Sequence, residues 1–187
     1  MTGPSENQCM EFPEIKTERC VLRQVVPEDK PDILRGLSNP AVTEFMPIHY
    51  STIDEVENQM EFYKNHWDFQ TGVFWVIEWS ESNAFAGVMG LYDVNLFHHS
   101  VEWGFWLLPE FRGKGIIAET APYIMDYAFN DLNLNRIKAE IETQNTASIR
   151  VIQKFGFIQE GILRQCEINR NGEYIDLMIF SRLKSDL

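Results

Sequence analysis

The chain has 187 residues, 44% of them hydrophobic, so it is long enough for one domain with a sizeable core and short for two. Its 28 acidic and 16 basic residues give a net charge of −12, which argues against a general electrostatic grip on nucleic acid phosphates. No apolar run approaches the roughly 20 residues that a membrane-spanning helix needs, so we expect no membrane protein.

The first sixteen residues are polar and acidic, and they lack the basic start and apolar stretch of a secretory signal. We expect a single domain over residues 1–187 in which residues 1–16 are loosely ordered, and we expect the chain to stay in the cytoplasm. The three cysteines, Cys9, Cys20 and Cys166, form no CxxC pair. We therefore expect reduced thiols, with neither a disulfide framework nor a metal site.

Alternating apolar and polar residues predict strands, and apolar residues three or four apart predict helices. In chain order these patterns predict a strand over 17–26, helices over 27–38 and 52–67, strands over 73–79, 84–92 and 100–108, a helix over 115–130, a strand over 137–142, a helix over 145–155, and strands over 157–170 and 173–182. Asn39-Pro40 should end the first helix, and Asn171-Gly172 should turn the last two strands into a hairpin. This order predicts a mixed α+β sheet with one central crossover.

The most informative segment is Trp106–Glu119, where a strand and a proline precede a basic, glycine-rich loop and then a helix. Gly113 and Gly115 let backbone N–H groups approach a ligand closely, and the helix dipole adds about half a positive charge. Arg112 and Lys114 add two full positive charges. A pyrophosphate fits such a loop, although a plain strand-to-helix turn with solvated basic side chains explains it equally well.

The run Gly113–Ala118 (GKGIIA) also satisfies the dinucleotide fingerprint GxGxxG/A, whereas the Walker pattern is absent. A Rossmann domain needs further parallel βαβ units on both sides of this loop. Here three predicted antiparallel strands precede the loop and a hairpin nearly ends the chain. The context therefore excludes a dinucleotide-binding domain.

Two segments resemble a known family. Residues 111–119 (FRGKGIIAE) resemble the acetyl-coenzyme A loop of the GNAT superfamily of N-acetyltransferases, whose core pattern is Q/R-x-x-G-x-G/A. Residues 145–157 (NTASIRVIQKFGF), followed by Glu160-Gly161, are similar to the RimJ/RimL branch, which acetylates the N-termini of ribosomal proteins. The resemblance extends from Thr17 onward. It implies the GNAT fold, an α+β fold whose mostly antiparallel sheet of six to seven strands is splayed at the cofactor strand and flanked by about four helices.

The resemblance also implies acetyl-CoA as the cosubstrate, without a metal. It implies that the strand before the loop pairs with the pantetheine arm and that the loop holds the pyrophosphate. Ile117 stands where the family pattern has Gly or Ala, so we expect it to crowd the approach to the phosphates. The implied cofactor-binding residues are Phe105, Leu107, Arg112, Gly113, Lys114, Gly115, Ile116, Ile117 and Asn145.

Acyl transfer from a thioester to an amine needs a deprotonated amine, a stabilised oxyanion and a proton for the departing thiolate. A lysine or α-amino acceptor has an ordinary pKa of about 10.4 or about 8, so a carboxylate must take its proton. Glu102, on the strand that leads into the loop, is the first candidate base. Glu140, on the charged face of the neighbouring strand, is the second. Each can also be an ordinary solvent-facing strand carboxylate.

The remaining catalytic roles come from the resemblance. It implies that backbone N–H groups near Leu107 stabilise the oxyanion, a contribution that is often large. It further implies that Asn145 bonds the pantetheine amide and that Ser148 donates a proton to the thiolate. From the residues alone, Asn145 and Ser148 are equally well explained as the N-cap and the third residue of a helix.

These assignments predict direct transfer in a ternary complex to a primary amine, with a protein N-terminal α-amino group as the first expectation. A small amine, such as a polyamine, an amino acid or an antibiotic, is the alternative within the same class, and a non-catalytic acyl-CoA-binding module is another. Residues 1–109 hold seventeen acidic and six basic residues, whereas residues 110–170 are neutral. We therefore expect a cationic acceptor, with surface solubility as the competing explanation for the acids. A homodimer remains open.

Overall fold

The computed structural model describes residues 11–187. The strands are β1 (Ile15–Lys16), β2 (Cys20–Gln24), β3 (Val73–Trp79), β4 (Ala84–Asn95), β5 (Ser100–Leu107), β6 (Arg136–Glu142), β7 (Ile158–Ile168) and β8 (Tyr174–Leu183). The α-helices are α1 (Lys30–Leu37), α2 (Pro40–Thr43), α3 (Ile53–Asp68), α4 (Ile116–Asp126) and α5 (Thr146–Lys154), and a π-helical turn (Tyr127–Asp131) extends α4. No helix within this described range is long and apolar enough to cross a membrane.

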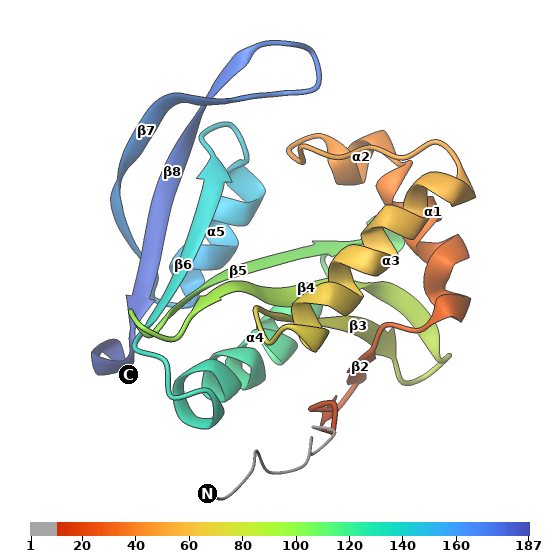
Figure 1. Cartoon of the computed structure of the whole chain (residues 1–187), viewed down its shortest axis with the longest axis horizontal. Helices are drawn as coiled ribbons and strands as arrows, with labels where there is room; N and C mark the ends of the chain where they lie inside the picture. The colour runs from red at the N-terminus through yellow and green to blue at the C-terminus, as the bar shows by residue number, and fades with distance from the viewer. Residues whose placement is uncertain (1–10) are drawn as a thin grey trace, which may run out of the picture.

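The strands form one sheet in the order β1-β2-β3-β4-β5-β6-β8-β7 (Figure 1). Every neighbouring pair is antiparallel except β5 and β6, which run parallel because α4 crosses over between them. The predicted mixed α+β fold is confirmed. The described residues contain eight strands and five α-helices, against the six to seven strands and about four helices expected.

The additional elements are β1 and α2. Within the segment expected to be loosely ordered, Ile15 and Lys16 pair with β2, and the Pro13 carbonyl accepts a hydrogen bond from Trp75 Nε1 at 2.7 Å. Residues 1–10 lie outside the described part of the chain. Asn39-Pro40 ends α1 as predicted but also starts α2, because Asn39 Oδ1 caps the Ala41 N–H and proline suits the first helical position.

Adjacent side chains of a strand point to opposite faces of the sheet, so Phe74 and Trp75 identify which helices cover each face. Phe74 packs against Tyr63 of α3, with 4.7 Å between the ring centroids. Trp75, which is fully buried, packs against Tyr127 of the π-helical turn at 5.6 Å. Helices α1 and α3 therefore cover one face and α4 the other (Figure 1).

The parallel pair β5 and β6 stays together over only three residue pairs, from Ser100 and Arg136 to Glu102 and Lys138. Beyond that point β5 continues to Leu107 and β6 to Glu142, and the two strands diverge (Figure 1). The N–H of Leu108 donates to Ala86 on the β4 side, so the Leu107 N–H faces the open edge of β5. The splayed sheet that the resemblance implied is present.

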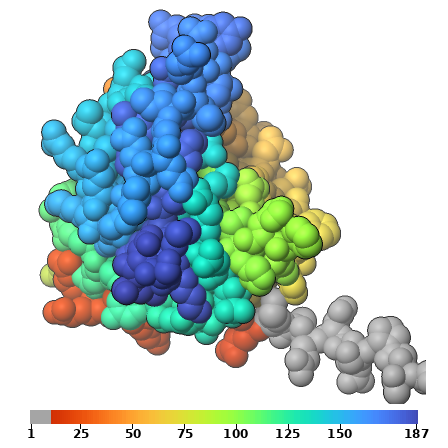
Figure 2. All heavy atoms as spheres, turned by 90° about the vertical axis from the view of Figure 1, so that its left-hand side faces the viewer, coloured from red at the N-terminus to blue at the C-terminus, as the bar shows by residue number. Residues whose placement is uncertain are grey.

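The last two strands form the predicted hairpin at the edge of the sheet. Its tip, around Gly172, projects beyond the body of the molecule (Figure 2). At this tip Arg170 Nη1 donates to Thr43 Oγ1 at 3.2 Å. The hairpin therefore reaches across the open end of the splay and touches α2.

Glycines in the central strands allow aromatic rings to lie flat against the sheet beside the splay. A Cβ atom at Gly90 would stand 2.2 Å from the Phe74 ring, and one at Gly104 would stand 3.1 Å from the Tyr92 ring. The Phe74 and Tyr92 rings stack at 5.8 Å with 11° between their planes. This stack connects α3 to the residues at the start of the splay.

We expect Gly90→Ala to lower the free energy of unfolding by about 1–3 kcal/mol, because its methyl group overlaps the Phe74 ring. Gly161→Ala is the matched control, since a Cβ there meets no atom within 4 Å. Urea unfolding followed by circular dichroism measures both variants. Equal unfolding free energies for the two would contradict the close packing of Phe74 on β4.

Candidate active site

The two candidate bases lie together where β5 and β6 separate. Lys138 Nζ lies 2.8 Å from Glu102 Oε2 and 3.1 Å from Glu140 Oε1. Glu102 and Lys138 form the last parallel pair, and Lys138 and Glu140 are alternate residues on one face of β6. Burial opposes the ammonium charge, but the two carboxylates outweigh it and raise the pKa of Lys138. The site therefore holds two acids around one lysine.

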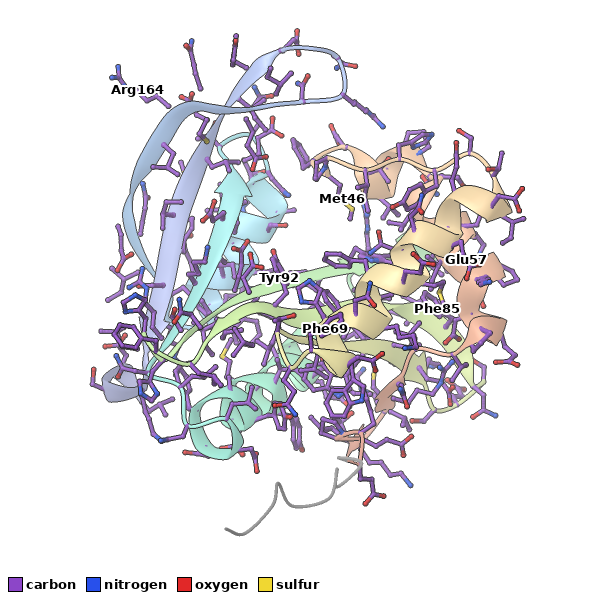
Figure 3. All side chains as sticks on the ribbon, in the orientation of Figure 1. Met46, Glu57, Phe69, Phe85, Tyr92 and Arg164 are labelled. Carbon is purple, nitrogen blue, oxygen red and sulfur yellow. The ribbon has the colours of Figure 1, made fainter. Side chains whose placement is uncertain are left out.

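Tyr92 belongs to this cluster, and the sequence reasoning did not identify it. It lies opposite Glu102 in the β4–β5 register, and its hydroxyl donates to Glu102 Oε1 at 2.7 Å (Figure 3). Burial and the Glu102 charge raise the pKa of Tyr92, so the hydroxyl remains a donor. The available signal was the hairpin register of the strands predicted over 84–92 and 100–108.

The loop between β5 and α4 lies between a strand and a helix, as the sequence predicted. Gly113 and Gly115 have φ angles of +75° and +78°, and Gly115 directly precedes α4. Among residues 11–187, no protein acceptor pairs with the backbone N–H groups of residues 113–117. A Cβ at Gly113 would meet no atom within 4 Å, so there is open space beside these donors. Unpaired N–H groups at a helix N-terminus form an anion site.

The two basic side chains of this loop already have partners. Arg112 Nη2 donates to the Ala41 carbonyl at 2.9 Å, and its Nε donates to the Leu107 carbonyl at 3.3 Å. The Lys114 ammonium lies over the Phe111 ring, 4.9 Å from the centroid. In this conformation the backbone is therefore the main set of free donors in the loop.

The expectation that Ile117 crowds the phosphates is wrong. Ile117 is 7% exposed and Ile116 1%, and both side chains belong to the core beneath the loop. A larger side chain is tolerated at this motif position because it is buried in the core.

Residues near the N-terminus brace the loop, and the sequence reasoning did not find this contact. Glu119 Oε1 accepts hydrogen bonds from Thr17 Oγ1 at 2.5 Å and from the Arg19 N–H at 2.7 Å. Arg19 Nη1 also donates to the Lys114 carbonyl at 3.1 Å. Burial raises the pKa of Glu119, but these hydrogen bonds outweigh it and lower that pKa overall. The first turn of α4 is thus tied to the start of β2.

The start of α5 has the predicted cap. Asn145 Oδ1 accepts a hydrogen bond from the Ser148 N–H at 3.1 Å, and Ser148 is half-buried in the first turn. These contacts confirm the local geometry. The roles of Asn145 toward pantetheine and of Ser148 toward a thiolate remain predictions.

Aromatic side chains fill the face of β5 opposite to Glu102. Phe105 packs on Trp103 with 5.2 Å between ring centroids, and Phe155 and Phe157 enclose Trp103 from the α5 side. Trp103 is 3% exposed, yet its Nε1 has no acceptor within residues 11–187. A buried unpaired donor is costly, so a bound acceptor beside it would be favourable.

Acidic side chains gather near the open end of the splay. Glu44 follows α2, Glu142 ends β6 and Glu173 precedes β8. Burial, together with the charges of Glu44 and Glu173, raises the pKa of Glu142. Figure 3 places Met46 on the α2 side of this opening and Tyr92 beside β5. We call Glu44, Glu142 and Glu173 the acidic mouth.

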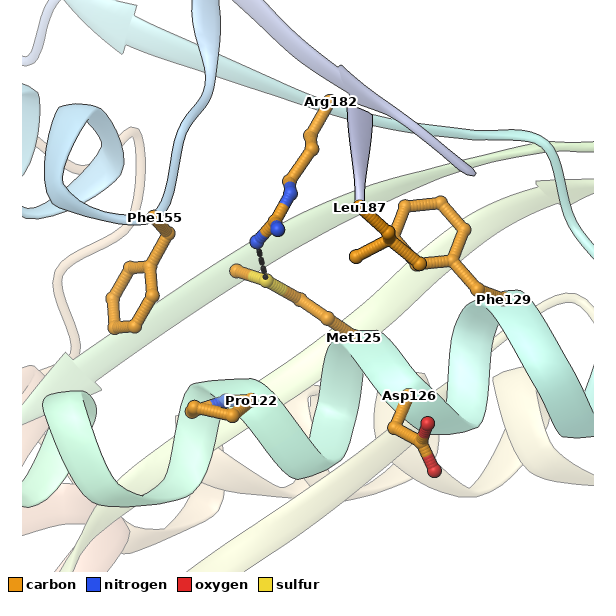
Figure 4. Close-up of a pocket in the computed structure, with 7 residues that line it drawn as sticks. All are labelled: Pro122, Met125, Asp126, Phe129, Phe155, Arg182 and Leu187. Carbon is orange, nitrogen blue, oxygen red and sulfur yellow. Dashed lines mark hydrogen bonds between the residues drawn. The ribbon is translucent and has the colours of Figure 1, made fainter. Parts of the chain in front are cut away.

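A separate cavity of about 170 Å³ lies between α4, α5 and β8 (Figure 4). Arg182 Nη1 donates to Met125 Sδ there at 3.3 Å. None of the predicted site residues lines this cavity, so it is distinct from the splay. The lining residues are Pro122, Met125, Asp126, Phe129, Phe155, Arg182 and Leu187.

The described cysteines lie outside these clusters. Burial raises the pKa of Cys20 to about 11, so this thiol stays protonated and is a poor nucleophile. Cys166 lies exposed on β7, and Cys9 lies outside the described residues. Over residues 11–187, no three His, Cys, Asp or Glu side chains are grouped to hold a metal ion.

Comparison with known proteins identifies the class of this chain. Residues 19–158 match the family described as the acetyltransferase (GNAT) domain. The chain therefore belongs to the GNAT family, and it is an acetyl-CoA-dependent acetyltransferase. It is 30% identical to YoaA of Bacillus subtilis (strain 168), an uncharacterized N-acetyltransferase, over 92% of this chain and 98% of that protein.

Two comparisons involve spermidine acetylation in Vibrio cholerae. The spermidine N(1)-acetyltransferase of that organism is 30% identical over 68% of this chain and 71% of its own length. The crystal structure of the spermidine N-acetyltransferase from V. cholerae in complex with CoA and spermine matches with a TM-score of 0.79. Its sequence is 27% identical, and the match covers 90% of this chain and 97% of that one. The assignment to the RimJ/RimL branch remains a prediction.

The residues present fit acetyl-CoA. The unpaired N–H groups of residues 113–117 are donors for phosphate oxygens, and the open edge of β5 at Leu107 can pair with amides of a pantetheine arm. The donors therefore match a ligand that carries both phosphates and amides.

We expect Gly113→Ala to weaken CoA binding about tenfold. A left-handed φ of +75° costs a non-glycine residue roughly 1–2 kcal/mol, and relief of this strain would turn the loop N–H groups away. Gly172→Ala is the matched control, since Gly172 has a φ of +80° and similar open space but lies in the β7–β8 turn. Isothermal titration calorimetry with CoA measures both. An equal loss of affinity in the two variants would contradict the loop assignment.

Proposed function

We propose that this enzyme acetylates a cationic primary amine and that a polyamine is the acceptor it favours. The observation that carries the proposal is the acidic mouth of Glu44, Glu142 and Glu173, together with Glu102 and Glu140 at the inner end of the splay. Carboxylates at two depths of one opening match ammonium groups spaced along a flexible alkyl chain. Similarity to spermidine N-acetyltransferases supports this choice.

This proposal assigns a group of the protein to each requirement of the reaction: removal of the amine proton, stabilisation of the oxyanion and protonation of the thiolate. Acetyl-CoA supplies the acetyl group as a thioester. Glu102 takes the proton of the acceptor ammonium, directly or through water, while Tyr92 holds its other oxygen. The Leu107 N–H stabilises the negative charge that develops on the carbonyl oxygen, and Ser148 gives a proton to the departing thiolate. Glu140 is the second candidate base, and Asn145 orients the pantetheine arm.

A protein N-terminal α-amino group is the second candidate acceptor, supported by the RimJ/RimL-like run at residues 145–157. Incubation with acetyl-CoA and either spermidine or a basic peptide with a free N-terminus distinguishes the two by mass spectrometry. We expect one added acetyl group on spermidine. Acetylation of the peptide alone would overturn the polyamine assignment. CoA binding without acetylation of any amine would instead identify a binding module.

Glu102→Gln should lower kcat by about 10²-fold or more, since a general base typically contributes that much. Combining it with Ser148→Ala should lower kcat further. Glu61→Gln, on the exposed side of α3, is the control for loss of one carboxylate. The measurement is steady-state release of free CoA thiol. Unchanged turnover in the double variant would show that this mechanism is wrong.

The acidic mouth should make acceptor capture depend on salt and pH. Because the pKa of Glu142 is raised, its negative charge develops over a higher pH range, and the acceptor KM should fall as pH rises through that range. Rising ionic strength should raise the acceptor KM. Glu142→Gln should weaken both dependences, and Glu61→Gln should leave them intact. An acceptor KM that does not change with ionic strength would count against a cationic acceptor.

A further inference from the structure

The ammonium group of Lys138 sits where the proposed acceptor must bring its own ammonium group. It contacts Glu102 Oε2 at 2.8 Å and Glu140 Oε1 at 3.1 Å, so both candidate bases are occupied by a single internal cation. Two carboxylates around one ammonium leave this cluster with a net charge of −1. The cluster is therefore a cation site that the chain itself fills.

Within this site the Glu102 carboxylate is held more firmly than the Lys138 ammonium. The Glu102 side chain is 12% exposed, and its Oε1 accepts a hydrogen bond from the Tyr92 hydroxyl. The Tyr92 ring is itself held, because it stacks on the Phe74 ring and lies beside Gly104. Lys138 is 32% exposed and carries its charge on a flexible four-carbon stem. The ammonium can turn out to solvent, whereas the Glu102 carboxylate keeps its hydrogen bond to Tyr92.

The contact between Glu102 and Lys138 lies where an acceptor would have to bind. Glu102 and Lys138 form the last residue pair before β5 and β6 separate, so they lie at the inner end of the splay. An acceptor that gives its proton directly to Glu102 must approach the oxygen that Lys138 now holds. The acceptor and Lys138 cannot both occupy it.

We infer that Lys138 is a resident cation that the acceptor ammonium displaces from between Glu102 and Glu140. This inference rests on the proposed function. Displacement exchanges one ammonium for another, so a cationic acceptor restores the ion pairs that Lys138 gives up. A neutral molecule of the same shape leaves two partly buried carboxylates without a cation, which is costly. Lys138 is thus a positioning residue that selects for charge in the acceptor.

Lys138→Met tests the inference through the split between KM and kcat. We expect the KM for spermidine to fall about fivefold, because no internal cation competes, while the KM for acetyl-CoA stays within twofold. Lys138→Arg should raise the KM for spermidine, since a guanidinium holds carboxylates more tightly. A fall in kcat at unchanged KM would overturn the inference and make Lys138 a support for Glu102.

The matched control is Lys64→Met, which removes the same charge from a 72% exposed, ion-paired lysine of α3. It should leave the KM for spermidine unchanged. If the KM for spermidine fell equally in both variants, the change in net charge alone would explain the effect, and the inference would be overturned. Thermal unfolding of each variant confirms that it is folded.

A second readout does not require turnover. NMR of lysine ammonium groups in the wild-type protein, titrated with spermidine in the presence of CoA, should show the Lys138 signal lose its ion-paired character. Acetylation without this displacement refutes the inference alone. Displacement without acetylation of any amine refutes the proposed function alone, and the absence of both refutes both.

Discussion

The separation of β5 from β6 is the constraint on which the rest of the site depends. Backbone N–H and C=O groups in a sheet centre need partners, and the edge of β5 beyond Glu102 has lost those of β6. The open edge at Leu107 therefore suits a ligand with amide groups. The same separation exposes the Glu102 cluster on the α3 face and leads directly into the loop before α4. One divergence thus brings the open edge of β5, the Glu102 cluster and the loop before α4 into one region.

Features that depend on neighbouring residues could be predicted from the sequence, whereas features that depend on register could not. The glycine-rich loop that leads into a helix and the Asn145 cap both follow from local sequence, and both were predicted. Tyr92 joins the cluster only through its pairing with Glu102, and Thr17 meets Glu119 across 102 residues of chain. No local pattern indicates the Thr17 contact, and the Tyr92 contact follows only once the register between β4 and β5 is known. The helix α2 was missed because a proline that ends one helix can also begin the next.

Composition predicted a cationic acceptor but not which acidic residues would gather in the folded chain. The first 109 residues carry most of the acid surplus, yet Asp29 and Glu78 in that segment are paired with Arg23. The acidic mouth instead takes Glu142 and Glu173 from the part of the chain that is nearly neutral. Folding neutralises some acids locally and gathers others, so net charge along the sequence does not locate a binding site.

The most direct measurement is a crystal structure of the enzyme with CoA and spermidine bound together. We predict that the pantetheine arm lies along the open edge of β5 and that its sulfur ends beside the Glu102 cluster. We also predict a spermidine nitrogen between Glu102 and Glu140, with the Lys138 ammonium turned away. A CoA sulfur remote from this cluster, or an acceptor nitrogen that leaves the contact between Lys138 and Glu102 intact, would contradict these predictions.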